Sequence, residues 1–268
     1  MNVPPPFVVF SDLDGTLLDH DTYDWAAARP SLAALKRHAI PLVLASSKTA
    51  QEIVLIQKEL GLSSLPAIVE NGAGCLGTGW EAEAAEAEYK KIRTTLAQMP
   101  SDLRRHFVGF GDMGLDQVVA VTGLSVESAA RAQQRCFSEP GLWQGTDTER
   151  ALFEHVLQQN GISVRQGGRF LTLSFGHTKA KRMQEIATQY GNAPTVALGD
   201  APNDIEMLEN ADVGVIIRNP HRAPLGRLQG EATGRIFRTD DPGPLGWNAA
   251  MLSIIARFEE ETRLSSDG

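Results

Sequence analysis

Short runs of apolar residues recur along the chain, separated by stretches in which apolar residues return every three or four positions. Five such runs occupy residues 7–10, 42–45, 67–69, 195–198 and 213–217. Runs of this length without alternation are typical of strands that are buried on both faces, as in a parallel sheet. The stretches between them predict amphipathic helices. The chain therefore predicts an α/β fold with a doubly wound, mainly parallel, Rossmann-like sheet.

Helix signals between the apolar runs support this interpretation. The letters TAQE at residues 49–52 match a capping box at a helix N-terminus. After it, Ile53, Ile56 and Leu60 share one helical face, and the same spacing recurs in residues 251–258. Helices that alternate with apolar strands are what a doubly wound sheet requires.

Residues 80–176 follow another pattern. They begin with an Ala/Glu-rich stretch at 81–88, which suggests a linker or the solvated start of a helix. Ser125 and Asp147 are candidate N-caps of two further helices. In residues 162–175, two strand-like segments flank a Gly-Gly pair, which is typical of a hairpin turn. This region predicts a separate α+β unit.

The chain length suits this division, because 268 residues can form a core domain with a smaller partner. We predict a core of residues 1–79 and 177–268 with an inserted cap domain at 80–176. The formal net charge of −8 disfavours a nucleic-acid partner. No apolar run approaches the roughly 20 residues of a membrane helix. The two cysteines form no disulfide pattern, and the first residues lack a signal-peptide pattern, so we expect a cytoplasmic protein that acts on a small molecule.

Two aspartates follow the first predicted strand directly. The motif DLDGT at residues 12–16 places Asp12 and Asp14 at the carboxyl end of strand 7–10. Open α/β sheets bind ligands at this end of their strands. The competing interpretation is an ordinary turn in which Gly15 adopts a positive φ. The rarity of the motif favours the ligand site.

A second acidic motif, GDAPND at residues 199–204, follows the predicted strand 195–198. It places Asp200 and Asp204 at the same sheet edge, although Asp204 alone could serve as a charge at a helix N-terminus. Carboxylates gathered in one crevice repel each other and raise one another's pKa. A hard divalent cation with oxygen ligands relieves this repulsion, so we predict Mg²⁺ as the cofactor.

Two weaker features indicate contacts with an anion. Ser46 and Ser47 lie at the turn after strand 42–45, where hydroxyl and backbone N–H groups suit a phosphate. Lys179 opens a predicted helix, an unfavourable place for a cation unless it faces carboxylates and a phosphoryl group. Taken singly, these residues could equally be loop serines and a solvated lysine.

The order of these motifs along the chain, with DLDGT, SSKT, the lysine and GDAPND each placed beside a predicted strand or helix, resembles the haloacid-dehalogenase superfamily of phosphotransferases. The insert resembles the larger α/β cap of that superfamily. Within the superfamily, the chain is most similar to the mannosyl-3-phosphoglycerate phosphatases. The matching stretches, which cover most of the chain, are SSKT, ENGA, TGLS, SEP, GGRF and GDAPND.

The resemblance implies a role for each residue at a motif position. Asp12 is the expected nucleophile, which forms an aspartyl phosphate. Asp14 is expected to protonate the leaving alkoxide and then to activate water. Ser46 and Lys179 are expected to hold the oxygens of the transferring phosphoryl group. The expected Mg²⁺ ligands are Asp12, Asp14 (through its backbone carbonyl), Asp200 and Asp204.

The cap is expected to confer specificity by closing over the crevice. Arg169 is the candidate partner of the substrate carboxylate, because a guanidinium matches a carboxylate with two parallel hydrogen bonds. The other candidate substrate contacts are Ser47, Lys48, Glu70, Asn71, Gly72 and Asn203. Each of these could instead be a structural loop residue.

The resemblance implies Mg²⁺-dependent hydrolysis of mannosyl-3-phosphoglycerate to mannosylglycerate, a compatible solute. Alternatives are the glucosyl analogue or another phosphosugar, a phosphomutase, a D-x-D glycosyltransferase and a non-catalytic phospholigand-binding protein. The letters GAGCLG at residues 72–77 fit a dinucleotide-binding pattern but lie outside the first βαβ unit, so we interpret them as a turn. The six histidines show no spacing typical of metal ligands.

Overall fold

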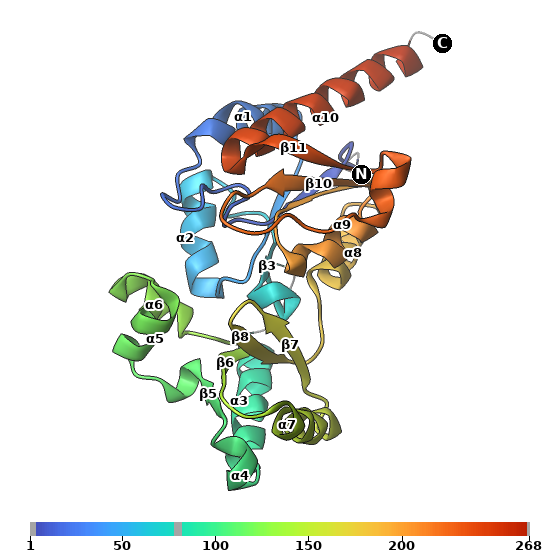
Figure 1. The fold of residues 1–268 in the computed structure, drawn as a ribbon. Coiled ribbons are helices and arrows are strands. Elements are labelled where there is room, and N and C mark those ends of the chain that lie inside the picture. The colour runs from blue at the N-terminus through green and yellow to red at the C-terminus, as the bar shows by residue number, and fades with distance from the viewer. Residues whose placement is uncertain (1–3, 78–81, 267–268) are drawn as a thin grey trace. The chain divides into compact units, whose positions relative to one another are not determined.

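The structure, a computed structural model, describes residues 4–77 and 82–266 (Figure 1). The chain divides into two compact units. The first comprises Met1–Ser46, Leu65–Ala67 and Lys179–Gly268. The second comprises Ser47–Ser64 and Ile68–Thr178.

A seven-stranded sheet has the order β11-β10-β9-β1-β2-β3-β4. The pairs β1–β2, β1–β9, β9–β10 and β10–β11 are all parallel, which confirms the predicted α/β class. All five predicted apolar runs form strands. The strands are β1 (Val8–Ser11), β2 (Leu42–Ala45), β3 (Ala67–Val69), β4 (Gly74–Leu76), β9 (Thr195–Gly199), β10 (Val213–Arg218) and β11 (Ile236–Pro242).

Two strands of this sheet were not predicted. Strand β11 has the letters IFRTDDP and lies at the sheet edge, where polar residues replace a continuous apolar run. Strand β4 lies inside the glycine-rich stretch 72–77 that we interpreted as a turn, so that interpretation was wrong for residues 74–76. A glycine is needed at position 74 because the Phe137 ring packs directly against this strand. A Cβ at Gly74 would lie only 2.3 Å from that ring.

The helices of the first unit bury one apolar face each. In α10, for example, Met251 and Ile255 are buried as the spacing predicted, and Trp247 on the same helix is fully buried. The α-helices are α1 (Arg29–Arg37), α8 (Lys179–Gln189), α9 (Ile205–Asn210) and α10 (Gly243–Ser266). Short 3-10 helices are η1 (Ala26–Ala28), η4 (Pro202–Asp204) and η5 (Gln229–Thr233).

The second unit contains a four-stranded antiparallel sheet with the order β5-β6-β8-β7. Its strands are β5 (Phe107–Gly109), β6 (Glu139–Trp143), β7 (Ser163–Gly167) and β8 (Phe170–Ser174). The helices are α2 (Ala50–Leu60), α3 (Ala82–Gln98), α4 (Ser101–Arg104), α5 (Leu115–Thr122), α6 (Val126–Ala132) and α7 (Asp147–Gln159), with η2 (Glu70–Gly72) and η3 (Phe110–Asp112).

The predicted hairpin is present as β7 and β8, but its turn lies one residue later than expected. Gly167 pairs with Phe170, so Gly168 and Arg169 form the two-residue turn. Only the first of them, Gly168 with φ of 56°, has a positive φ, which is the mark of a type II′ turn. On β8, Leu171 and Leu173 face the same side of the sheet and are fully buried.

The predicted helix starts are correct in two places and shifted in one. Thr49 caps α2 in a capping box, and Ser125 caps α6 by accepting a hydrogen bond from the Ser128 backbone. The N-cap of α7 is Thr146, and Asp147 is the first helical residue instead of the cap. The hydroxyl of Thr146 accepts the hydrogen bond that we had assigned to the carboxylate of Asp147.

The whole four-stranded sheet lies within residues 80–176, the predicted cap. The predicted boundary at residue 80 falls in 78–81, outside the described residues, so the cap limits stay a prediction. The part of the Ala/Glu-rich stretch from Ala82 onward is helical and opens α3. Among the described residues, none of the helices has the length and apolar character needed to cross a membrane.

Candidate active site

The carboxyl ends of β1 and β9 bring the two acidic motifs together. The strands pair in parallel with Ser11 opposite Leu198, and the Asp12 backbone N–H donates to the Leu198 carbonyl at 2.9 Å. The side chains of Asp12, Asp200 and Asp204 are buried, and one carboxylate oxygen of each lies within 4.8 Å of the others. We call these three residues the aspartate cluster.

Lys179 joins two members of the aspartate cluster. Its Nζ lies 2.7 Å from Oδ1 of Asp12 and 2.7 Å from Oδ1 of Asp204. The ammonium group is buried at the start of α8. Burial alone lowers the pKa of a lysine, but the charges of Asp12 and Asp204 outweigh it and raise the pKa of Lys179. Lys179 is therefore a permanent cation inside the cluster.

Asp204 is held in place by its own loop. Its Oδ2 accepts hydrogen bonds from the backbone N–H groups of Asp200 (3.2 Å) and Ala201 (3.1 Å). Gly199 permits this approach, because a Cβ at that position would lie 2.5 Å from the Cβ of Asp204. Since Oδ1 contacts Lys179, both oxygens of Asp204 are engaged.

Asp200 is surrounded by hydrogen-bond donors. Thr16 donates from Oγ1 to Oδ1 at 2.9 Å, and Asn219 donates from Nδ2 to Oδ2 at 2.7 Å. The Nε of Arg222 lies 3.2 Å from the same Oδ2. Gly15, with φ of 81°, makes room for Asn219, because a Cβ there would lie 2.5 Å from its Nδ2.

Negative charge is in excess within the aspartate cluster. Burial and the nearby charge of Asp12 raise the pKa of Asp200 and of Asp204, and Lys179 opposes this effect at Asp204. Three buried carboxylates face one buried ammonium and the exposed guanidinium of Arg222, and they offer oxygen atoms as ligands. Such a donor set fits a hard divalent cation of the Mg²⁺ class, which would neutralise the excess charge.

A buried tryptophan supports the end of β1. The Nε1 of Trp247 donates to Oγ of Ser11 at 2.9 Å, and that hydroxyl donates to the Asp12 carbonyl at 2.7 Å. Helix α10 therefore fixes the backbone at Asp12 through a chain of two hydrogen bonds.

The remaining predicted site residues of the first unit lie at strand ends or in the GDAPND loop. Asp14 is half-buried two residues after Asp12, and Ser46 is buried directly after β2. Asn203 lies in η4 and is exposed. Their positions agree with the strand-end placement that the sequence predicted, and their chemical roles stay predictions.

The other predicted substrate contacts belong to the second unit. Ser47 is exposed and Lys48 is half-buried, between the end of β2 and helix α2. In the turn η2, Asn71 is half-buried and Gly72 is buried. Arg169 is exposed at the tip of the β7–β8 hairpin, with its guanidinium 5.6 Å from the centre of the Phe170 ring.

Glu70 is placed differently from what a substrate contact requires. Its side chain is fully buried, and its carboxylate is occupied by Arg135 and by the backbone and side-chain donors of residues 136–138. This arrangement favours a structural or positioning role over contact with a substrate.

Sequence reasoning missed three residues around Asp200. Thr16 lies inside the DLDGT motif, and its position four residues after Asp12 was the available signal. Asn219 and Arg222 follow β10, the neighbour of β9 in the sheet. The strand-end rule that we applied to β1 and β9 extends to β10 and could have indicated them.

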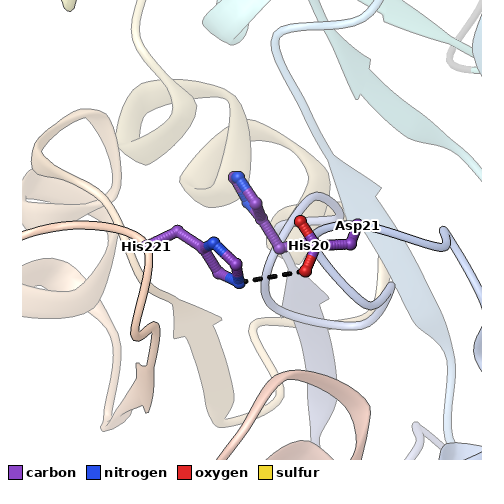
Figure 2. A group of neighbouring side chains, drawn as sticks. All are labelled: His20, Asp21 and His221. Atoms are coloured by element: carbon purple, nitrogen blue, oxygen red, sulfur yellow. Dashed lines mark ion pairs between the residues drawn. The ribbon is translucent and has the colours of Figure 1, made fainter.

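A second group of possible metal ligands consists of His20, Asp21 and His221, which each offer a ligand atom within 4.8 Å of the others. Figure 2 shows the ion pair of 3.3 Å between Asp21 Oδ2 and His221 Nε2. The two imidazole rings are stacked with centres 4.3 Å apart and an interplanar angle of 17°. Because the nitrogen lone pairs lie in the ring plane, nearly parallel rings do not direct them at one ion. We assign no metal to this group.

Comparison with known proteins places this geometry in a family. The sequence model of the haloacid dehalogenase-like hydrolases matches residues 9–110 and 146–223, which include the aspartate cluster and Lys179. A Persephonella marina protein named glucosyl-3-phosphoglycerate/mannosyl-3-phosphoglycerate phosphatase is 34% identical over 272 residues, which cover 94% of this chain and 98% of the relative.

Solved structures agree with the fold. The sucrose-phosphatase of Synechocystis in complex with sucrose and phosphate has a TM-score of 0.60 and 18% identity, covering 95% of this chain and 98% of that one. A phosphatase of the haloalkanoate enzyme superfamily from Bacteroides thetaiotaomicron has a TM-score of 0.60 and 18% identity, covering 94% and 95%. At this identity, the likeness shows the architecture alone.

Proposed function

Because the chain is a phosphoric monoester hydrolase of the haloacid dehalogenase-like hydrolase family, we propose that it hydrolyses the phosphate ester of a glycosyl-3-phosphoglycerate. Mannosyl-3-phosphoglycerate is the first candidate, and the glucosyl analogue is the second. The observation that carries the chemistry is the buried Lys179, which lies 2.7 Å from both Asp12 and Asp204. The name of the Persephonella marina relative includes both sugars and supports this substrate class.

Asp12 is the proposed nucleophile. An oxygen of its carboxylate attacks the phosphorus atom, and the bond between phosphorus and the ester oxygen breaks, which leaves an aspartyl phosphate. The Ser11–Trp247 hydrogen bonds hold the backbone at this residue during the attack. Lys179 at Oδ1 orients the carboxylate and offsets the charge that gathers on the transferring phosphoryl group.

Asp14 is the proposed acid and base. As the ester bond breaks, its carboxylic acid gives a proton to the leaving alkoxide. Its carboxylate then takes a proton from a water molecule, whose oxygen attacks the phosphorus atom. The bond to Asp12 breaks, which releases inorganic phosphate and restores the carboxylate. Ser46, buried directly after β2, is proposed to hold a phosphoryl oxygen.

Mg²⁺ is the proposed cofactor, held by Asp12, the backbone carbonyl of Asp14 and Asp200, and it supplies charge neutralisation for the anionic nucleophile and substrate when bound. Thr16 and Asn219 orient Asp200 for this purpose. We expected Asp204 among the ligands. Because both of its oxygens are engaged by Lys179 and its own loop, we assign it first to holding Lys179.

Substrate selection is proposed for residues of the second unit. Lys48, Asn71 and Arg169 carry the charge and hydrogen-bonding groups that glycerate and sugar oxygens require. Residues 80–176 are the proposed cap domain, which would exclude water until the aspartyl phosphate has formed. Ser47 and Gly72 of the same unit, and Asn203 of the first unit, complete the proposed set of contacts.

Phosphate release from a substrate panel tests this proposal. The panel contains mannosyl- and glucosyl-3-phosphoglycerate, sucrose phosphate, hexose phosphates and 3-phosphoglycerate, with Mg²⁺ or with a chelator. We expect strong release from one or both glycosyl-3-phosphoglycerates, lost in Asp12→Asn and with the chelator. Asp240→Asn, which alters an exposed carboxylate on β11, is the matched control and should remain active.

The other outcomes each select an alternative. Even release across the panel would retain the phosphatase chemistry and reject the specific substrate class. Transfer of the phosphoryl group to a second sugar hydroxyl without release would indicate a phosphomutase. Binding of a nucleotide sugar without release of phosphate would indicate a glycosyltransferase.

A further inference from the structure

The turn η2 has an unusual backbone. Its three residues, Glu70, Asn71 and Gly72, have φ of 50°, 59° and 93°. Glycine adopts such angles freely and asparagine tolerates them, but a glutamate in this region costs about 1 kcal/mol or more. A strained conformation of this kind persists only when the surrounding contacts determine it.

The Glu70 carboxylate makes those contacts. Its Oε1 accepts a hydrogen bond from the Cys136 backbone at 2.9 Å, and its Oε2 accepts from Ser138 Oγ at 2.7 Å and from the Phe137 backbone at 3.3 Å. The Nε of Arg135 lies 3.2 Å from Oε2. The carboxylate of Glu70 is fully buried, and both of its oxygens accept hydrogen bonds. Residues 135–138 therefore fix the conformation of turn η2 through this carboxylate.

Arg135 extends this connection to the loop that follows β2. Its Nη1 donates to the Ser47 carbonyl at 3.3 Å, and its Nη2 donates to Ser138 Oγ at 2.8 Å. The backbone N–H of Glu70 donates to the Lys48 carbonyl at 2.9 Å. The backbone of Lys48 is thus tied to Glu70 directly, and its neighbour Ser47 is tied to Arg135.

Helix α6 adds a contact just outside this arrangement. Thr49 Oγ1 donates to the Arg131 carbonyl at 3.1 Å, while Thr49 also caps α2. Consecutive residues 47–49 are therefore each fixed, two by segment 131–138 and one by Glu70. Three separate contacts on three residues leave this loop little freedom to move relative to turn η2.

We propose that Glu70 and Arg135 are positioning residues that fix Lys48 and Asn71 relative to each other for recognition of the non-phosphoryl part of the substrate. This inference rests on the proposed function, which assigns Lys48 and Asn71 to that part. Glu70 acts through the loops it holds and does not touch the substrate. The strained backbone of η2 follows from placing Asn71 directly after the buried and fixed side chain of Glu70.

The test compares Arg135→Met with Arg135→Lys and Glu70→Gln. The methionine removes the guanidinium and retains an apolar chain, whereas the lysine keeps a charge partner for Glu70. In Glu70→Gln, the amide places N–H groups against backbone donors. The matched control is Arg150→Met on α7, which removes an arginine of the same unit whose guanidinium contacts Glu154 and Gln166.

Steady-state kinetics use the glycosyl-3-phosphoglycerate and p-nitrophenyl phosphate, which has no glycerate or sugar. We expect Arg135→Met and Glu70→Gln to raise KM for the glycosyl substrate about tenfold or more, because a small misplacement of binding groups is costly. The constants for p-nitrophenyl phosphate should change little. Arg135→Lys should fall between the parent and Arg135→Met. Equal losses on both substrates, or no loss on the glycosyl substrate, would overturn the proposal.

Hydrogen exchange gives a readout that is independent of the substrate. Arg135→Met should speed amide exchange in peptides covering 47–49 and 70–72, and Arg150→Met should not. Unchanged exchange would overturn the proposal whatever the kinetics. If the parent protein hydrolyses no glycosyl-3-phosphoglycerate while exchange rises as expected, the proposed function fails and the positioning of the two loops stands. Thermal unfolding of each variant ensures that folded protein is compared.

Discussion

Two charge clusters, one in each unit, are built on opposite principles. The aspartate cluster sets three buried carboxylates against two cations: the buried ammonium of Lys179, which contacts Asp12 and Asp204, and the exposed guanidinium of Arg222, which contacts Asp200. The cluster in the second unit, which we call the arginine network, pairs the carboxylates of Glu139 and Asp112 with the guanidiniums of Arg93 and Arg104. It also includes the hydroxyl of Tyr89.

The arginine network is balanced. Glu139 accepts from Tyr89 Oη, Arg93 Nη1 and the Gly111 backbone, each at 2.8 Å. Asp112 contacts Arg93 and Arg104 at 2.6 Å each. Burial opposes ionisation of Asp112, but the two arginines outweigh it and lower its pKa, whereas the deeper burial of Glu139 raises the pKa of that carboxyl. Every charge has a partner, so the network holds the α3 helix, η3 and β6 together and leaves no charge for a ligand to neutralise.

The two clusters show the difference between charges that stabilise the fold, as in the arginine network, and charges that bind a ligand, as in the aspartate cluster. A buried anion in the second unit is neutralised by the protein, whereas the aspartate cluster needs a cation from outside. Excess buried charge beside strand ends is a physical mark of a functional site. Substitutions in the aspartate cluster should therefore affect activity, whereas substitutions in the arginine network should affect stability.

The largest expected effect comes from the aspartate cluster. Asp12→Asn should lower kcat by about 10⁴-fold or more, because removal of a nucleophile removes the whole covalent route. The midpoint of thermal unfolding should not fall, since the substitution reduces the charge repulsion in the cluster. Phosphate release measures kcat, and thermal unfolding followed by circular dichroism measures the midpoint. Full activity in Asp12→Asn would remove this residue from the mechanism.

The arginine network should show the reverse pattern. Arg93→Met leaves Glu139 buried without its cation, which should lower the free energy of unfolding by about 3 kcal/mol. Turnover of p-nitrophenyl phosphate at a temperature where the variant is folded should stay close to that of the parent. Urea unfolding and the same phosphatase assay test this. A loss of turnover without a loss of stability would contradict the structural role.

Metal binding should sharpen the contrast. Mg²⁺ at a hundredfold excess over its Kd should stabilise the folded state by about 2.7 kcal/mol. Asp200→Asn should abolish most of this gain, and Arg93→Met should retain it. Thermal unfolding with Mg²⁺ and with a chelator provides the measurement. An equal gain in Asp200→Asn would place the ion elsewhere.

The smallest expected effect is on the pH dependence of the free energy of unfolding, measured with a chelator present. The folded-state pKa of Asp200 lies above its ordinary 3.8, so the folded state binds the extra proton. Its contribution to stability is therefore present below pH 3.8 and is lost as the pH rises through the folded-state pKa. Asp200→Asn should flatten that decline.

Asp112 should act with the opposite sign. Its folded-state pKa lies below 3.8, so its contribution is present above pH 3.8 and is lost as the pH falls through the folded-state pKa. Asp112→Asn should flatten the acid limb of the stability curve. Unfolding by urea at a series of pH values compares the two variants, and equal slopes in both would refute the distinction between the clusters.

Local patterns predicted the parts of this molecule in which sequence neighbours act together. The apolar runs predicted β1, β2, β3, β9 and β10, and the strand-end rule predicted that DLDGT and GDAPND meet. Strand β11 was not predicted because an edge strand needs no continuous apolar run. The hairpin turn was misplaced by one residue because only pairing, here Gly167 with Phe170, decides which residues form the turn.

The remaining gaps in the prediction depend on distant contacts. Glu70 looks like a polar loop residue in the sequence, and only the contact with residues 135–138 shows that it is buried. Asn219 and Arg222 meet Asp200 because β10 lies beside β9, which spacing along the chain does not reveal. Trp247 reaches Ser11 from a helix that begins more than two hundred residues later.

One measurement tests the central claim, that the aspartate cluster performs phosphoryl transfer through Asp12, most directly. Asp14→Asn is mixed with Mg²⁺ and p-nitrophenyl phosphate, whose leaving group needs no acid, and the reaction is stopped with acid for peptide mass spectrometry. The account predicts one phosphoryl group on the peptide that contains Asp12, accumulated because the amide introduced by the substitution cannot activate water. Release of p-nitrophenol without any label on Asp12, or with a label on another residue, would contradict it.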